Sequence, residues 1–322
     1  MLEPFAGWWD HAAHNLTRVT FVPLASAATR AASLLSGAID ATVELPLQDI
    51  ARVRTDPRLE VIQGPELRTI YLGFDQFRDE LLYIDVKGRN PFKDHRVREA
   101  VYRAIDIQAI HRVVMANTSW SAGMMASPQL NGAPADINDR LPFDPELAKR
   151  LLVAAGYPDG FGVTIACPND RYVNDERICQ AIAGMLAKVG IRLTVQAETT
   201  AAWSRRTAAL DVSMFMLGHA GLPLADAHST LAEVLHTRTG GAGGLNIGRY
   251  SNPALDALVD RVREQADEPL RRALIREALL LEKADIGHVP LHQQPITWAT
   301  RKGIALHPAP DNQLRLRLVT VP

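Results

Sequence analysis

Apolar positions along the chain alternate between the two-residue spacing of strands and the three- to four-residue spacing of helices. One kind of element follows the other over most of the length, which is typical of an α/β fold. The predicted strands are residues 17–23, 38–45, 59–63, 69–75, 161–167, 191–197, 211–217 and 288–298, with an edge strand at 314–321. The predicted helices are residues 26–35, 46–54, 94–105, 106–115, 146–155, 175–189 and 269–283, with another that begins at 252–253.

Capping residues support several of these helices. Asp94 stands directly before one predicted helix, and Asp144 and Asn252 each precede a proline that suits the first helical turn. Residues 117–141 are rich in Ser, Gly, Pro and Asn without periodicity, so we expect an irregular surface loop there. The run of helices and strands over residues 146–197 predicts one sheet with crossover helices.

Length and composition fit a globular protein of two lobes. The chain has 322 residues, of which 47% are apolar and 22% charged, and its formal net charge is −1. A chain without excess positive charge lacks the basic surface that binding to nucleic acid requires. No segment reaches the roughly 18 apolar residues of a membrane span. The N-terminus shows no basic segment followed by an apolar run, so this chain carries no visible signal peptide.

The chain has two cysteines, Cys167 and Cys179. They are too few for a disulfide framework or a Cys-rich zinc site. They can be two small buried side chains, or they can form a bridge if the compartment is oxidising. Sequence spacing alone leaves both alternatives open.

No set of catalytic residues stands out. The Gly-x-Ser-x-Gly turn of serine hydrolases is absent from the sequence. The glycine-rich residues 240–244 follow a predicted helix and lack the Gly-Lys-Ser/Thr ending of a phosphate-binding loop, so we expect a mobile loop. We therefore expect neither enzymatic activity nor a cofactor.

Histidines also fail to indicate a metal site. His219, Asp226, His228 and His236 fall within a short stretch, but no pair has the close helical spacing of metalloproteases. His288 and His292 are separated by Pro290, which excludes a helix that would aim both at one ion. We assign no metal ligand.

Two loops beside the predicted strand 211–217 are the best candidates for a ligand site. They are residues 218–228 and 240–250, which mix glycine with polar and aromatic groups and lie on either side of a helix. Asp226 is suited to a cation and Arg249 to a carboxylate, and aromatic residues can line a pocket. The candidate ligand-binding residues are His219, Asp226, Arg249, Tyr250 and Trp203.

Several segments resemble motifs of the family 5 extracellular solute-binding proteins, in the same order and at similar spacing. The strongest is Asn90-Pro91-Phe92 with its continuation to Asp106, and residues 143–157 are similar to the second strong motif. The remaining segments are residues 5–9, 34–40, 71–75, 250–256 and 289–292. The resemblance thus covers nearly the whole chain, and its motifs are mostly caps, turns and core positions, which identify a fold more than a ligand.

This resemblance implies a periplasmic-binding-protein-like fold of type II, with lobe two complete and lobe one partial. Lobe two would be residues 86–302, and lobe one would hold residues 1–85 and the returning tail 303–322. It also implies a receptor of an ABC importer, which binds a short peptide or similar small polar solute in the cleft between lobes and delivers it to permease subunits in the inner membrane. The full-length parent would be periplasmic or extracellular.

Two departures from the family pattern matter. Family members have a large segment ahead of the region where this chain begins, which would carry the export signal and much of lobe one. Peptide-binding members place a Trp and an Asp in the loop that matches residues 218–228, and that Asp holds the peptide's amino group. His219 stands at the Trp position here, and the Asp position falls near Leu222, a few residues before Asp226.

Other functions stay open at this point. The same fold binds non-peptide solutes, such as a nickel chelate, an oligosaccharide or an opine. A two-domain α/β hydrolase is an alternative of another class, although the chain shows no nucleophile or acid–base pair at a recognisable spacing. A cytoplasmic regulatory domain is a third, and only the absent export signal supports it.

Overall fold

The computed structural model describes residues 1–11, 13–24 and 26–322. The chain divides into two compact units. Unit 1 comprises Met1–Glu66 and Pro295–Pro322, and unit 2 comprises Leu67–Gln294. The lobe limits implied by the family resemblance, 86–302 for lobe two, remain a prediction.

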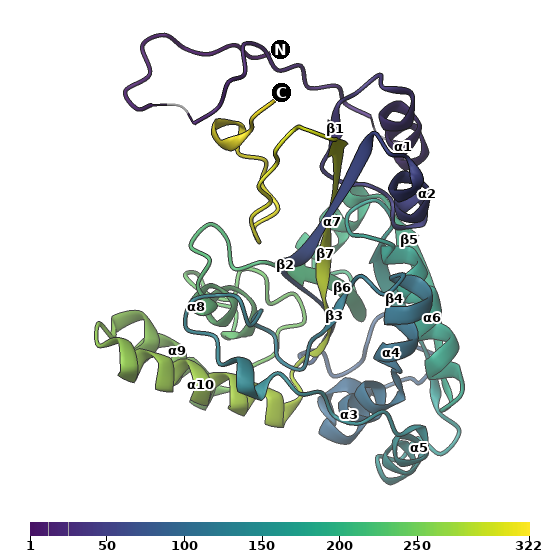
Figure 1. Cartoon of the computed structure of the whole chain (residues 1–322). Helices are drawn as coiled ribbons and strands as arrows, with labels where there is room; N and C mark the ends of the chain where they lie inside the picture. Colours follow the sequence, from purple (N-terminus) through teal and green to yellow (C-terminus); the bar gives the residue numbers. More distant parts are fainter. Residues whose placement is uncertain (12, 25) are drawn as a thin grey trace. The chain divides into compact units, whose positions relative to one another are not determined.

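The helices agree with most of the sequence expectations (Figure 1). In unit 1 they are α1 (Ala27–Ser36), α2 (Ile50–Thr55) and the short 3-10 helices η1 (Leu47–Asp49) and η6 (Leu316–Leu318). The α-helices of unit 2 are α3 (His95–Ala104), α4 (Ile107–Ala109), α5 (Pro145–Ala154), α6 (Asp175–Ala187), α7 (Thr200–Ala208), α8 (Ala227–Thr230), α9 (Pro253–Glu264) and α10 (Glu268–Asp285). Its shorter segments are the 3-10 helices η2 (Pro91–Lys93) and η4 (Ala135–Ile137) and the π-helices η3 (Ile110–Val114) and η5 (Leu231–Leu235).

The strands form a mixed sheet in the order β1-β7-β2-β6-β4-β5, with β3 also paired to β7. They are β1 (Ala41–Thr42), β2 (Leu59–Phe74), β3 (Trp120–Ser121), β4 (Phe161–Pro168), β5 (Ile191–Glu198), β6 (Met214–His219) and β7 (Val289–Arg301). β2 and β7 run through both units, whereas β3 to β6 belong to unit 2 alone.

Unit 2 contains the parallel part of the sheet. β4 pairs in parallel with β5 from Phe161–Ile191 to Pro168–Glu198, and α6 connects the two strands. This confirms the predicted crossover arrangement. β6 is parallel to β4 and antiparallel to β2, so the strand pairing changes from parallel to antiparallel at β6.

The predicted helix caps are confirmed. The side chain of Asp94 accepts the N–H of Arg96, and that of Asp144 accepts the N–H of Leu147. Asn252 accepts backbone N–H groups at the start of α9, ahead of its first-turn proline. These short polar side chains satisfy donors that have no partner within a helix, which fixes where each helix begins.

Several predicted strands differ from the structure. Residues 17–23 form only a bridge between Leu2 and Val19, because their side chains face solvent and have no core to cover. The weakly alternating tail 314–321 contains a 3-10 turn and a single bridge at Thr320. The predicted strands 59–63 and 69–75 are one strand, since the glycine and proline between them both tolerate an extended backbone.

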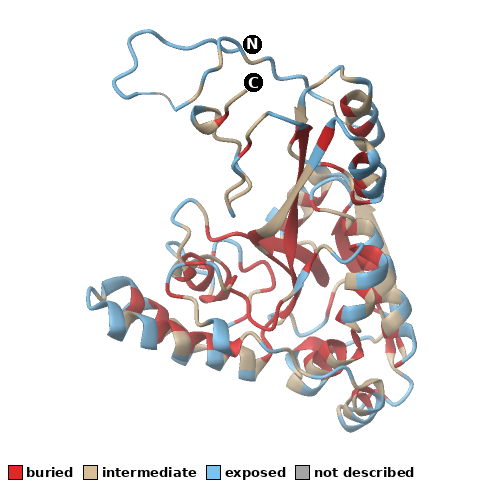
Figure 2. Ribbon diagram, viewed as in Figure 1, coloured by how far each residue is buried: buried red, intermediate tan, exposed pale blue. Residues whose placement is uncertain are grey.

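Each unit has its own apolar core. In unit 2, α7 to α10 and the strands contribute to one cluster that includes Tyr71, Trp203 and Phe215. In unit 1, Ile296 and Trp298 pack with Leu306 and Val319 of the C-terminal tail. Figure 2 shows that the residues of β6 and β7 are buried along almost their whole length, while the outer faces of α9 and α10 are exposed. Of the helices in the described ranges, none has the length and apolar character needed to cross a membrane.

Candidate functional site

The carboxyl ends of β4, β5 and β6 lie at one edge of the sheet in unit 2, because these strands run parallel. In open α/β sheets, ligands bind in the crevice outside this edge. β2 runs the opposite way, with Thr69 opposite His219, so the preceding residue Arg68 also lies at this edge. The sheet thus brings together side chains from loops far apart in sequence.

Tyr172, in the loop after β4, lies at the centre of this edge. Its hydroxyl accepts the N–H of Gly218 at 2.9 Å and the Nε–H of Arg171 at 2.8 Å. The guanidinium carbon of Arg171 lies 5.3 Å from the centroid of the Tyr172 ring, and that of Arg68 lies 5.8 Å from it. One aromatic ring therefore contacts two cations.

Trp203 adds a second aromatic ring. It is buried in the first turn of α7, a helix that Thr199 caps directly after β5. The guanidinium carbon of Arg171 lies 5.1 Å from its ring centroid. We call Arg68, Arg171, Tyr172, Trp203 and Gly218 the carboxyl-edge site.

Gly218 is required for this packing. A Cβ atom at this position would lie 3.0 Å from Tyr172 Cε1, 2.9 Å from Arg68 Cδ and 2.6 Å from a methyl carbon of Ile70. A larger residue would therefore require Ile70, Arg68 or Tyr172 to shift.

Arg171 is the exposed cation of the site. It forms no ion pair within the part of the chain that the structure describes, and its side-chain contacts are those to Tyr172 and Trp203. A guanidinium has five N–H donors in a planar fork that matches a carboxylate. The carboxyl-edge site is therefore suited to a ligand that carries a carboxylate.

His219 follows Gly218 at the end of β6 and points to the opposite face of the sheet. Its Nε2 lies 3.0 Å from Glu233 Oε2, and its Nδ1 lies 3.2 Å from Thr230 Oγ1. The hydrogen bond with His219 lowers the pKa of Glu233. His219 therefore joins β6 to α8 and η5.

Asp226 caps α8 and is paired with a cation of the protein. Its carboxylate accepts the N–H of His228 at 2.8 Å and binds Arg271 at 2.7 and 3.1 Å. Burial alone would raise the pKa of Asp226, but the Arg271 guanidinium and the N–H of His228 keep it below its usual range. The cation that the sequence leads one to expect at Asp226 is thus supplied by α10.

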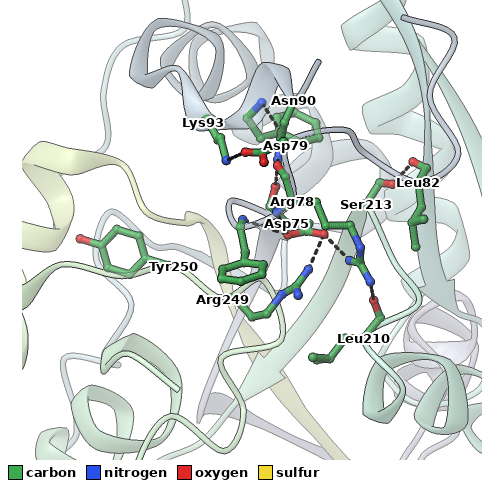
Figure 3. A network of polar contacts seen from close by, with 12 residues as sticks. Asp75, Arg78, Asp79, Leu82, Asn90, Lys93, Leu210, Ser213, Arg249 and Tyr250 are labelled. Atoms are coloured by element: carbon green, nitrogen blue, oxygen red, sulfur yellow. Dashed lines mark hydrogen bonds and ion pairs between the residues drawn. The ribbon is translucent and has the colours of Figure 1, made fainter. Parts of the chain in front are cut away.

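Arg249 is paired in the same way with a carboxylate of the protein. Figure 3 shows Arg249 and Arg78 converging on Asp75, which is buried. Arg249 Nη2 lies 2.8 Å from Asp75 Oδ2, and its guanidinium carbon lies 4.5 Å from the Phe77 ring centroid. The neighbouring Tyr250 is in the core of unit 2, where burial raises the pKa of its hydroxyl.

The five residues expected from the sequence do not form one cluster. His219 and Asp226 both contact α8, whereas Arg249 binds Asp75 beside the opposite end of β6. At about 3.4 Å per residue, the two ends of this strand lie roughly 17 Å apart. Of the five, only Trp203 belongs to the carboxyl-edge site.

Two cavities lie elsewhere in unit 2. One of about 440 Å³ is lined by Arg249, Tyr250 and their neighbours Gln76, Phe77 and Ser251, among others. Another of about 510 Å³ is formed by residues between Ile105 and Phe143. Neither of these two cavities is lined by Arg171 or Trp203.

Histidine and carboxylate side chains do not combine into a metal centre in the described part of the chain. No group of three or more His, Cys, Asp or Glu residues there is placed to hold an ion. His219 and Asp226, two residues of the stretch considered in the sequence, are instead bonded to Glu233 and Arg271.

Sequence reasoning missed Arg68, Arg171 and Tyr172. A usable signal was present for two of them, because Arg171 and Tyr172 follow the correctly predicted strand 161–167. Loops that follow parallel strands are where α/β proteins place binding residues. Arg68 carries no such local signal, since its place depends on the pairing of β2 with β6.

Comparison with known proteins agrees with the fold. Residues 1–242 match the model of the bacterial extracellular solute-binding proteins, family 5 Middle. The dipeptide-binding protein of Pseudoalteromonas sp. SM9913, solved in complex with Met-Leu, superposes with a TM-score of 0.79 at 20% identity, over 98% of this chain and 60% of that one.

Curated relatives are similar in sequence over most of this chain. The glutathione-binding protein GsiB of Salmonella choleraesuis (strain SC-B67) is 24% identical over 94% of this chain and 57% of its own length. Heme-binding protein A of Haemophilus influenzae (strain ATCC 51907 / DSM 11121 / KW20 / Rd) is 26% identical over 86% of this chain and 48% of its own length. The chain thus spans about half the length of these relatives. Because the family model matches well over half of its residues, the chain belongs to the bacterial extracellular solute-binding proteins of family 5.

Proposed function

We propose that the protein is the solute-binding receptor of an ABC importer, and that its solute is a short peptide or a similar small molecule with a carboxylate. Arg171 carries this proposal. Its guanidinium is exposed on two aromatic rings at the carboxyl edge of the sheet, and no carboxylate of the described residues neutralises it. Such a group binds a carboxylate through two parallel hydrogen bonds.

The ligands of the similar proteins support this chemistry. Glutathione, haem and the dipeptide Met-Leu are named for three of them. These molecules differ greatly in size, but each carries at least one carboxylate. A cation held on aromatic rings binds that shared group and leaves the rest of the ligand to other contacts.

A receptor of this family is expected to work in the periplasm or outside the cell and to pass its solute to permease subunits. It is also expected to release the solute unchanged. Mass spectrometry of a bound peptide after prolonged incubation tests the last point, since cleavage products would favour the two-domain hydrolase instead.

The test of the binding site is calorimetric titration of the protein with glutathione, Met-Leu, haem and a nickel–histidine complex. Substituting Arg171→Gln is expected to weaken carboxylate ligands by about 10- to 100-fold, because a hydrogen bond to a charged group contributes roughly 1.5–3 kcal/mol. The matched control is Arg177→Gln, an exposed arginine of α6, which is expected to leave the Kd unchanged.

Ligand chemistry gives a second arm of this experiment. Met-Leu with a C-terminal amide is expected to bind the unmodified protein more weakly than the free acid does. Arg171→Gln is expected to leave the affinity for this amide unchanged, because the carboxylate that Arg171 would bind is already absent. If changing the acid to the amide weakens binding equally in the unmodified protein and in the Arg171→Gln variant, the carboxylate does not bind at Arg171.

His219, Asp226, Arg249 and Tyr250 stay predicted ligand contacts. Alanine at each of these positions belongs in the same titration, together with a melting curve. All four residues are bonded or buried within the protein, so their replacement can weaken binding through a loss of stability. A residue is therefore taken as a ligand contact only if its alanine variant has a higher Kd and an unchanged Tm.

A further inference from the structure

The loop that presents Arg171 and Tyr172 is closed by a covalent bond. Cys167, the last but one residue of β4, and Cys179, in α6, form a disulfide with a sequence separation of 12. Both cysteines are fully buried. The bond therefore ties β4, directly before the loop, to the second turn of α6, directly after it.

A buried carboxylate holds the middle of the same loop. Asp175 Oδ2 accepts the backbone N–H groups of Arg171 and Tyr172, each at 3.0 Å, and its Oδ1 accepts the N–H of Glu176 at 3.0 Å. The residue is only 3% exposed, so these hydrogen bonds do not compete with water. Asp175 thus fixes the backbone of both site residues.

The loop is also tied to the helix that carries Trp203. Asp170 Oδ1 accepts the N–H and the hydroxyl of Thr200, each at 2.6 Å, at the start of α7. Since Trp203 lies one turn further along α7, a displacement of the loop changes the distance between Arg171 and both of its aromatic rings.

We propose that the Cys167–Cys179 disulfide and the Asp175 carboxylate are positioning groups of the carboxyl-edge site, which set its affinity without touching the ligand. This inference rests on the proposed function. The physical reason is preorganisation: a loop that is ordered before binding does not lose conformational entropy when the ligand arrives. The oxidised protein is accordingly the high-affinity form.

Reduction gives the low-affinity form. A dithiol such as dithiothreitol transfers two electrons and two protons to the bond, which leaves two thiols at Cys167 and Cys179 and closes the reagent to its own cyclic disulfide. Because both cysteines are buried, the reaction requires local opening of the loop and is slow in the folded protein.

The experiment compares the protein with Cys167→Ala/Cys179→Ala and with Asp175→Asn, using glutathione and Met-Leu as probes. Each variant is expected to raise the Kd about tenfold, which is about 1.4 kcal/mol. Glu176→Gln is the matched control for Asp175→Asn, because its carboxylate bonds to Gln180 and not to the loop. Protein reduced fully with dithiothreitol is expected to match the double-alanine variant.

Hydrogen exchange supplies a readout that a general loss of stability would not give. Amide groups of residues 169–174 are expected to exchange about tenfold faster in both variants, while those of β6 keep their protection. If the variants fold and show the Kd and loop exchange of the unmodified protein, the inference is wrong. If the double-alanine variant does not fold, the Kd and the loop exchange of Asp175→Asn test the inference instead.

The two proposals fail in different ways. A protein that binds no ligand of the panel contradicts the proposed function, and the exchange of residues 169–174 still decides whether the disulfide and Asp175 hold the loop. Binding that depends on Arg171 but is indifferent to the disulfide and to Asp175 contradicts the positioning role alone.

Discussion

Replacing Arg98 with alanine is expected to lower the free energy of unfolding by about 3 kcal/mol, because it leaves several backbone hydrogen-bond acceptors without their donor. Arg98 is buried in α3, and its guanidinium pairs with Asp285 at 3.0 Å. It also donates to the backbone carbonyls of Ile286 at 2.8 Å and Phe92 at 2.9 Å. Alanine leaves these acceptors, which lie in η2 and just after α10, without donors. Urea unfolding at neutral pH measures the change.

Two comparisons make the Arg98 test specific. Arg98→Lys keeps the charge but cannot form the planar set of hydrogen bonds, so we expect it to recover only part of the loss. Arg96→Ala removes an exposed arginine of the same helix, whose ion pair with Asp94 is screened by solvent and is expected to contribute little. A loss at Arg98 no larger than that at Arg96 would mean that the buried contacts do not hold α3 to α10.

Replacing His292 with leucine is expected to make the protein markedly less sensitive to acid. His292 is buried in β7, and neither ring nitrogen has a hydrogen-bond partner within the described residues. Burial, helped by the positive charges of Arg140 and His111, lowers the pKa of His292 from 6.5 to about 3. The folded protein therefore keeps this ring neutral at a pH where the unfolded chain has already protonated it.

The sign of the pH dependence follows from these two values. Above pH 6.5 the ring is neutral in both states and has no effect on stability through protonation. Between pH 6.5 and 3 only the unfolded chain binds the proton, so stability falls by about 1.4 kcal/mol per pH unit, or about 5 kcal/mol in all. His292→Leu removes this loss.

The measurement is the free energy of unfolding in urea at pH 7.5, 5.5 and 4. Carboxylates contribute equally to both proteins, so the difference between them isolates His292. The leucine variant is expected to gain about 3 kcal/mol relative to the unmodified protein between pH 7.5 and 4. His307→Leu, at an exposed histidine, is the control and should show no such gain. Parallel pH curves for the His292 variant and the unmodified protein would contradict the buried, neutral ring.

Local patterns in the sequence predicted much of the fold. The caps at Asp94, Asp144 and Asn252 act within one helical turn, so they are visible without any knowledge of the tertiary structure. The helix α7 was missed because its residues have no clear apolar spacing and one large buried side chain, Trp203. Strand β2 appeared as two strands because a Gly-Pro pair resembles a turn signal.

The candidate site was harder to predict because its contacts are distant in sequence. Arg249 and Asp75 are 174 residues apart, so the ion pair between them is not visible in any short motif. Arg171 reaches Trp203 only because β4 and β5 are adjacent and parallel. Strand order is a property of the whole fold, and short motifs do not encode it.

The covalent closure of the loop between Cys167 and Cys179 also affects how new specificities can be obtained. Both ends of this segment are joined to each other within the core, so its interior can be exchanged without moving β4 or α6. Libraries randomised at the exposed residues Asn169 and Arg171, which leave the contacts of Asp170 and Tyr172 in place, are expected to alter recognition without changing the scaffold. The exposed positions of this segment are therefore the ones to vary when biosensors are engineered from this chain.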